Sequence, residues 1–144
     1  MTEDAISRYA ARAVPRYTSY PTAPHFRPGL PERVYRDWLS ALDPGEPVSL
    51  YLHVPFCNQM CWYCGCNMKL ASRYGPVHDH FETLLAEIDL VADALPGRMQ
   101  VSHLHWGGGT PTALSTEDLT RAMERVWQHF DRVADASLPI EADP

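Results

Sequence analysis

The sequence predicts an α/β fold in which parallel strands alternate with helices. Apolar segments along the chain follow the order strand, helix, strand, helix, strand, which implies a parallel sheet with right-handed crossovers. The 144 residues, 45% of them hydrophobic, suffice for one domain with a core. Three strands and two helices make about half of a barrel or of an open sheet. We therefore expect the chain to be the N-terminal piece of a longer protein.

The first half of the chain predicts one helix and one strand. Residues 1–30 are rich in Pro, Tyr and Arg and lack periodicity, so we expect an N-terminal extended segment before a domain over residues 31–144. A helix is expected over residues 31–42, where apolar residues share one side. They are Val34, Trp38, Leu39 and Leu42. Residues 48–54 are densely apolar and predict a buried strand that Pro55 ends.

The second half predicts two helices and two strands. The longest helix is expected over residues 76–95 and is ended by Pro96 and Gly97, and a short strand follows over residues 101–106. Ser115 is expected to cap a second helix, with Asp118 three residues later. The third strand is expected over residues 137–141. Apolar stripes are predicted for both helices: Phe81, Leu84, Leu85, Ile88 and Val91 on the first, and Leu119, Met123, Val126, Trp127 and Phe130 on the second.

Composition excludes several classes of protein. The net charge is −6, so nonspecific binding to nucleic acid or to an anionic membrane is not expected. No apolar run approaches the roughly 18 residues of a membrane span, and the first residues do not resemble a secretory signal. The four cysteines are too crowded to form useful disulfides, which favours reduced thiols and a cytoplasmic protein.

Those four cysteines predict a metal site. Cys57, Cys61 and Cys64 have the spacing C-x-x-x-C-x-x-C, and Cys66 follows shortly after. Thiolates are soft ligands that suit iron–sulfur clusters or zinc. The single tight run favours a cluster with three protein ligands and one open iron, because closed zinc sites more often use two separated pairs. His53 could be a further ligand, but we interpret it as a hydrogen-bonded strand histidine.

Other candidate residues also follow the predicted strands. Gly107–Gly109 with Thr110 comes after the second strand, and a backbone without Cβ atoms could approach a ligand and hold a carboxylate or an ammonium group. Glu141 ends the third strand. In parallel α/β folds, sites gather at the carboxyl ends of strands, so we expect these groups to share one rim.

Aromatic residues and histidines near these groups leave alternatives open. Trp62 and Tyr63, between the cysteines, could shield a cluster, stack on a base or pack as ordinary loop residues. His103 and His105 share a strand face and could meet a substrate, although buried, satisfied histidines are commoner. On the long predicted helix, His78 and His80 are expected at the surface.

Together these motifs resemble the radical S-adenosylmethionine (SAM) superfamily, whose signature is the cysteine loop after the first strand and whose SAM-binding motif matches G-G-G-T-P. From about residue 9 to residue 144 the chain resembles one family in it, the oxygen-independent coproporphyrinogen III oxidases. Four segments carry this resemblance: residues 15–23 (PRYTSYPTA), 52–57 (LHVPFC), 64–66 (CGC) and 104–111 (LHWGGGTP). Cys66 and the first segment separate the chain from the related haem chaperone.

The resemblance implies a partial TIM-like barrel, truncated here after the third strand, and two cofactors. A [4Fe–4S] cluster would be held by Cys57, Cys61 and Cys64, with Cys66 not a ligand. The remaining roles are carried over by motif match. A first SAM would contact Tyr51, Gly108 and Glu141. Tyr63, Gly109 and Thr110 would contact a second SAM or line its pocket.

The activity implied is radical SAM oxidative decarboxylation. Reductive cleavage of SAM, removal of a hydrogen atom from a propionate side chain and loss of carbon dioxide leave a vinyl group. Done twice, this converts coproporphyrinogen III to protoporphyrinogen IX in haem biosynthesis. The expected partners are the tetrapyrrole and an electron donor such as a flavodoxin-type protein, and the full-length protein is expected to be a monomer. The 144-residue piece alone is expected to be inactive. A haem chaperone and a structural zinc-binding module are the alternatives.

Overall fold

The structure is a computed structural model that describes residues 25–62, 64 and 67–143. Contacts divide the chain into two units, Met1–Pro31 and Glu32–Pro144, and the second carries the helices and strands discussed below. The predictions for the segment 15–23, for Tyr63 and for Cys66 concern residues outside the described part.

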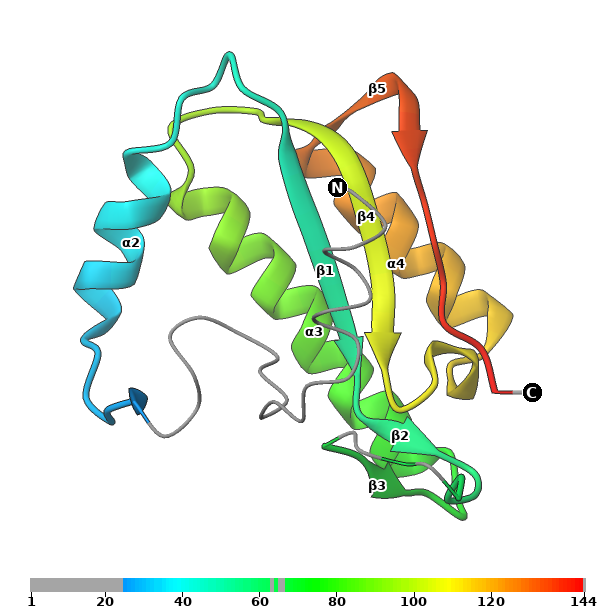
Figure 1. The fold of residues 1–144 in the computed structure, drawn as a ribbon. Helices are drawn as coiled ribbons and strands as arrows, with labels where there is room; N and C mark the ends of the chain where they lie inside the picture. The colour runs from blue at the N-terminus through cyan, green and yellow to red at the C-terminus, as the bar shows by residue number, and fades with distance from the viewer. Residues whose placement is uncertain (1–24, 63, 65–66, 144) are drawn as a thin grey trace, which may run out of the picture. The chain divides into compact units, whose positions relative to one another are not determined.

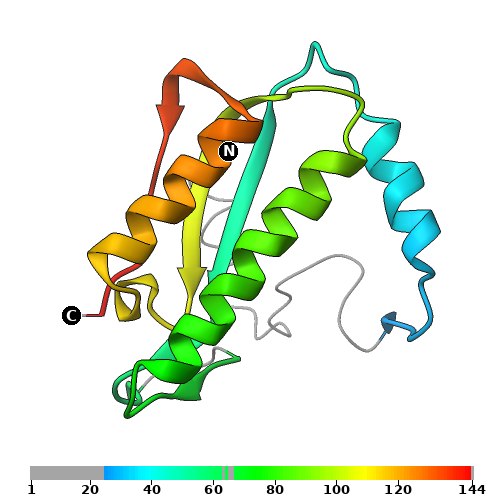
Figure 2. The ribbon, with the colours of Figure 1, turned by 180° about the vertical axis from the view of Figure 1, so that it is seen from behind.

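A three-stranded parallel sheet forms the centre of the second unit (Figure 1). Its order is β1 (Val48–Val54), β4 (Gln100–Gly108), β5 (Asp131–Ser137). Helix α3 (Gly75–Ala94) connects β1 to β4, and α4 (Thr116–His129) connects β4 to β5. Both helices cover the same face of the sheet, behind it in Figure 1 and in front of it in Figure 2. The predicted α/β class with parallel strands is confirmed.

The core lies between the sheet and these two helices. Strand alternation turns Leu50, Leu52 and Val54 of β1 toward the helices, since successive side chains point to opposite faces. The predicted stripe of α3 is buried except for half-buried Val91. On α4 the buried apolar positions are Ala122 and Val126, while the predicted Leu119, Met123 and Trp127 pack against the core as half-buried residues.

The opposite face of the sheet is polar. Ser49, Tyr51 and His53 of β1 lie on it, and the register places Tyr51 beside His105 and His53 beside Gly107 of β4. No described helix covers this face in either view (Figures 1 and 2). In the described part of the chain, the sheet therefore has one apolar face for the core and one polar face.

Helix α4 begins as predicted. The Ser115 hydroxyl accepts a hydrogen bond from the Asp118 amide at 3.1 Å. The Asp118 side chain is buried, which opposes its ionisation, but hydrogen bonds from Tyr74, His78 and Arg121 outweigh the burial and hold the pKa of this carboxyl below its ordinary range. His78 joins α3 to Asp118 and keeps 44% of its side chain exposed, so the expected surface position is correct in part.

The third strand differs most from the prediction. Strand β5 covers Asp131–Ser137, and beyond it only the single bridge between Trp106 and Ile140 continues the ladder. Pro139 has no N–H to donate, so regular pairing stops near it. The observed strand escaped sequence analysis because only Val133 and Ala136 are half-buried and the rest are exposed, which leaves no apolar alternation.

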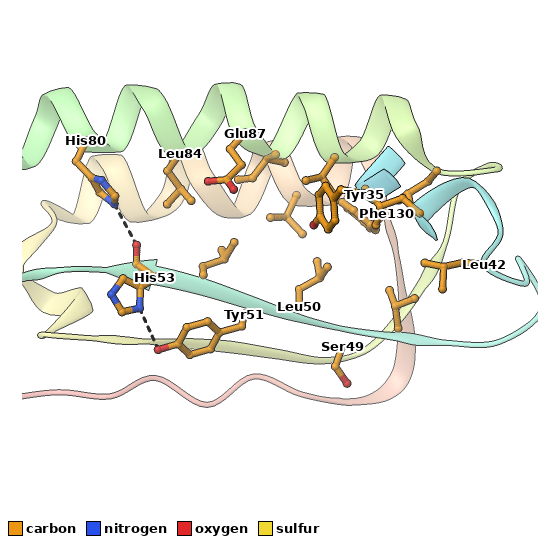
Figure 3. A pocket seen from close by; sticks show the side chains of 17 residues that line it. Tyr35, Leu42, Ser49, Leu50, Tyr51, His53, His80, Leu84, Glu87 and Phe130 are labelled. Atoms are coloured by element: carbon orange, nitrogen blue, oxygen red, sulfur yellow. Dashed lines mark hydrogen bonds between the residues drawn. The ribbon is translucent and has the colours of Figure 1, made fainter. Parts of the chain in front are cut away.

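Four further elements complete the described helices and strands. Helix α2 (Glu32–Ser40), expected over residues 31–42, has no buried residue. A parallel pair of two-residue strands, β2 (Phe56–Cys57) and β3 (Lys69–Leu70), was not predicted, and a 3-10 turn, η2 (Pro111–Ala113), follows β4. A groove of about 700 Å³ runs between α2, β1 and α3 and is largely apolar (Figure 3). None of the helices in the described residues is both long and apolar enough to cross a membrane.

Candidate active site

The candidate site lies at the carboxyl ends of β1 and β4, as the sequence predicts. The register brings Val54 beside Gly108, so the segment leading to Cys57 and the glycine run leave the sheet side by side. Backbone hydrogen bonds continue past the strands, from Gly109 N to Val54 O at 2.9 Å and from Thr110 N to Phe56 O at 2.8 Å. The cysteine loop and the glycine run are therefore tied together at their starts.

This contact requires glycine. A Cβ atom at Gly109 would lie 2.6 Å from Phe56 O and 2.8 Å from the Cys57 Sγ. Gly108 has a φ of +122°, and a Cβ there would lie 2.7 Å from Val54 O. Glycine is thus required at positions 108 and 109 by close packing within the protein, in addition to any approach to a ligand.

The three predicted metal ligands differ in exposure. Cys57 is buried, Cys61 is half-buried and Cys64 is exposed. The Cys61 thiol donates a hydrogen bond to Asp143 Oδ1 at 3.7 Å. In the described part of the chain, no three His, Cys, Asp or Glu side chains gather closely enough to bind one metal ion. Thiolates are soft ligands that suit iron, so the three cysteines fit an iron–sulfur cluster by their chemistry.

A polar cluster occupies the open sheet face next to the glycine run. It consists of Tyr51, His53, His105 and Glu141. The hydroxyl of Tyr51 hydrogen-bonds with His53 Nδ1 at 3.2 Å (Figure 3), and the Tyr51 and His105 rings lie 5.5 Å apart between centroids. His105 Nε2 lies 3.0 Å from Glu141 Oε1, and Gly108 N donates to Glu141 Oε2 at 3.2 Å. Three segments distant in sequence meet here.

Glu141 reaches this cluster although it lies outside any strand. Its amide donates to Trp106 O at 2.9 Å, and Pro139 O accepts from the Trp106 amide at 3.0 Å. These two bonds dock the segment after β5 onto β4. The predicted proximity of Glu141 to the glycine run is therefore present, while its predicted strand is not.

Thr110 lies deeper than its predicted role suggests. It is buried, and its hydroxyl hydrogen-bonds with Thr112 Oγ1 at 2.8 Å and accepts from the Asp143 amide at 3.1 Å. The side chain thus binds other protein groups, and any contact with a ligand would use the backbone.

The sequence favoured a structural role for His53 and His105, and it predicted no separate role for Gly107. The position of His105 could have indicated its role in the site. It lies two residues before Gly107, so its side chain is on the same sheet face as that of its strand neighbour Tyr51. At Gly107 a Cβ would lie 2.7 Å from the Tyr51 hydroxyl and 3.1 Å from the Glu141 carboxyl carbon. His80, expected at the surface, is half-buried because its Nε2 donates to His53 O at 3.1 Å (Figure 3).

The chain is similar in sequence to known enzymes. The chain is 44% identical over its whole length to an oxygen-independent coproporphyrinogen III oxidase of Bradyrhizobium diazoefficiens, and 41% identical over 130 residues to one of Escherichia coli K12. It spans 32% and 28% of these two relatives, respectively.

A solved structure and a family profile give the same result. The structure of Escherichia coli coproporphyrinogen III oxidase, described as a radical SAM enzyme, matches 99% of this chain and 31% of its own, with a TM-score of 0.80 and 37% identity. The profile of the radical SAM superfamily matches residues 51–135, from Tyr51 of the polar cluster through the cysteine loop and the glycine run to β5. This chain belongs to the radical SAM superfamily.

Proposed function

We propose that this chain forms the cofactor-binding part of an oxygen-independent coproporphyrinogen III oxidase. The observation that carries the proposal is the convergence of three groups at one rim of the sheet. These are the cysteine loop, the glycine run and Glu141, joined by the bonds of Gly109, Thr110 and Gly108. Identity of 44% to a relative of that name supports the substrate class.

Cys57, Cys61 and Cys64 would hold a [4Fe–4S] cluster, and one iron would remain open for SAM. When bound, the cluster and SAM together supply a carbon radical that removes a hydrogen atom from a propionate side chain. The chain's own contribution is to place the cluster beside the glycine run. A Cβ added at Gly109 would lie only 2.8 Å from the Cys57 Sγ, so a displacement of either segment would be transmitted to the other.

The methionine end of SAM would lie against the polar cluster. The ammonium group of SAM is complementary to the carboxylate of Glu141. The Gly108 backbone and Tyr51 lie next to that carboxylate. Tyr63, Gly109 and Thr110 would serve a second SAM. Replacement of Gly108 by Val is a poor test of these contacts, because its positive φ and the nearby Val54 O would disturb the fold as well.

The proposed substrate is coproporphyrinogen III, converted to protoporphyrinogen IX, with electrons from a flavodoxin-type donor in the cytoplasm. The open polar face of the sheet supports a site for a polar substrate, since Tyr51 and His105 are within reach of solvent. A role in nucleic-acid or membrane binding is not proposed, given the net charge of −6.

The test is anaerobic reconstitution of the complete polypeptide that carries these residues, in parent, Cys57→Ser and Gly97→Ala forms. Gly97 has no neighbour within 4 Å of an added Cβ, so its variant is the matched control. We expect brown protein with equal iron and sulfide in the parent and control, and formation of protoporphyrinogen with SAM and a reductant. Cys57→Ser should lose iron and activity.

Other outcomes would contradict the proposal. Colourless protein that binds zinc without sulfide would indicate a structural metal module. A brown protein that binds haem, cleaves SAM and leaves coproporphyrinogen unchanged would indicate a haem chaperone.

A further inference from the structure

Two hydrogen-bond donors fix the carboxylate of Glu141. The Gly108 amide donates to Oε2 at 3.2 Å, and His105 Nε2 lies 3.0 Å from Oε1. A carboxylate only accepts hydrogen bonds, so the His105 ring carries its hydrogen on Nε2 and donates it. Each oxygen therefore accepts at least one hydrogen bond, which restrains the plane of the carboxyl group.

His105 is itself held in place. It lies on β4 opposite Tyr51 of β1 in the strand register, and the two rings are tilted by 41° at 5.5 Å. The Tyr51 hydroxyl is hydrogen-bonded with His53. The imidazole thus sits between the Tyr51 ring and the Glu141 carboxylate, with its donor nitrogen directed at the carboxylate.

The pair is open to solvent, with 41% of the His105 side chain and 50% of the Glu141 side chain exposed. Solvent-exposed polar pairs of this kind contribute little to stability, so fold stability does not account for this arrangement. A ligand that binds a freely rotating Glu must first order it, whereas a carboxylate that is already oriented avoids that cost.

We propose that His105 is a positioning residue that orients Glu141 to receive the ammonium group of SAM. The inference rests on the proposed role of Glu141 in SAM binding. His105 acts through Glu141 and does not itself contact the ligand.

Three variants separate positioning from general structure. His105→Phe keeps a β-compatible ring but removes the donor, and His105→Gln retains an amide donor near the position of Nε2. His103→Phe is the matched control, since His103 lies two residues earlier on the same strand and its ring bonds with Ser102 instead of Glu141.

The first measurement needs no cofactor. Amide hydrogen exchange at Gly108, resolved by mass spectrometry of the cluster-free protein, reports whether Glu141 Oε2 still accepts its hydrogen bond. We expect faster exchange in His105→Phe, and parent-like exchange in His105→Gln and His103→Phe. Unchanged exchange in His105→Phe would overturn the orienting role, whether or not the protein binds SAM.

The second measurement is the dissociation constant of SAM for the anaerobically reconstituted protein. We expect His105→Phe to bind SAM about three- to ten-fold more weakly, the effect of one side chain that must be ordered on binding. His105→Gln and His103→Phe should stay near the parent value. Equal weakening in His103→Phe and His105→Phe would refute a specific role.

These readouts distinguish the two hypotheses. A parent protein that carries the cluster but does not bind SAM would contradict the proposed function, and in that case the inferred role in SAM binding falls with it. A parent that binds SAM, together with a His105→Phe variant that binds it equally well, would contradict only the inference.

Discussion

Replacement of Gly109 by Ala should disturb the junction between the glycine run and the cysteine loop. Gly109 does not have a positive φ, so alanine is compatible with its own backbone. The added Cβ would nevertheless lie 2.6 Å from Phe56 O and 2.8 Å from Cys57 Sγ. The neighbours are backbone and a buried cysteine, which cannot rotate away as the end of a flexible side chain can.

The size of the effect follows from these distances. Ordinary contact begins near 3.4 Å, so the two segments must separate by roughly 0.8 Å. That shift would stretch the bonds from Gly109 N to Val54 O and from Thr110 N to Phe56 O, now 2.9 and 2.8 Å, beyond hydrogen-bonding range. Two lost backbone bonds at about 0.5–1.5 kcal/mol each predict a destabilisation of about 1–3 kcal/mol, the range typical of overpacked cores.

The assay is urea unfolding of the cluster-free protein by circular dichroism, followed by iron determination after anaerobic reconstitution. Gly97→Ala serves as control, because nothing lies within 4 Å of its added Cβ. We expect lower stability and lower iron content in Gly109→Ala alone. If both alanine variants match the parent in unfolding free energy and iron, the tight contact with Cys57 does not exist and the reasoning is wrong.

Three further predictions concern other parts of the molecule. Arg98 donates to the carbonyls of Trp127, Gln128 and Phe130 at the end of α4. Because its side chain is 46% exposed, Arg98→Ala should lower the urea unfolding free energy by only about 1–2 kcal/mol. Removal of the exposed Arg33 side chain should have almost no effect. The Asp118 pKa is lowered in the folded state, so its contribution is complete at neutral pH and is lost as the pH falls through the folded value, below about pH 4. Asp118→Asn should therefore be about 1–3 kcal/mol less stable at neutral pH, and its difference from the parent should shrink in acid; a difference independent of pH would contradict this assignment. Each cysteine is replaced by serine in turn, and iron and sulfide content are measured. The cluster should be lost in Cys57→Ser, Cys61→Ser and Cys64→Ser and retained in Cys66→Ser. Equal loss in all four variants would contradict the ligand assignment.

Local signals in the sequence determined much of the fold. The apolar run of Val48–Val54 predicted β1 with its observed bounds, and Ser115 predicted the start of α4. These features depend on residues that are neighbours in sequence, such as an N-cap hydroxyl and the amide three positions later. The order of strands and helices then restricted the sheet to parallel pairing, which placed the cysteine loop and the glycine run at one rim.

Contacts between distant segments could not be derived in this way. Strand β5 carries no apolar alternation, because its pairing with β4 depends on backbone bonds and not on burial. The approach of Gly109 to Cys57 depends on how two strands end side by side.

The sequence by itself therefore determined the class of the fold, and it predicted the cysteine loop, Gly108 and Glu141 as candidates for the site. Only the tertiary structure decided that His105 lies between Tyr51 and Glu141. The physical reason is that strand register and the docking of residues 139–141 onto Trp106 are set by hydrogen bonds between segments far apart in sequence, and no local pattern encodes them.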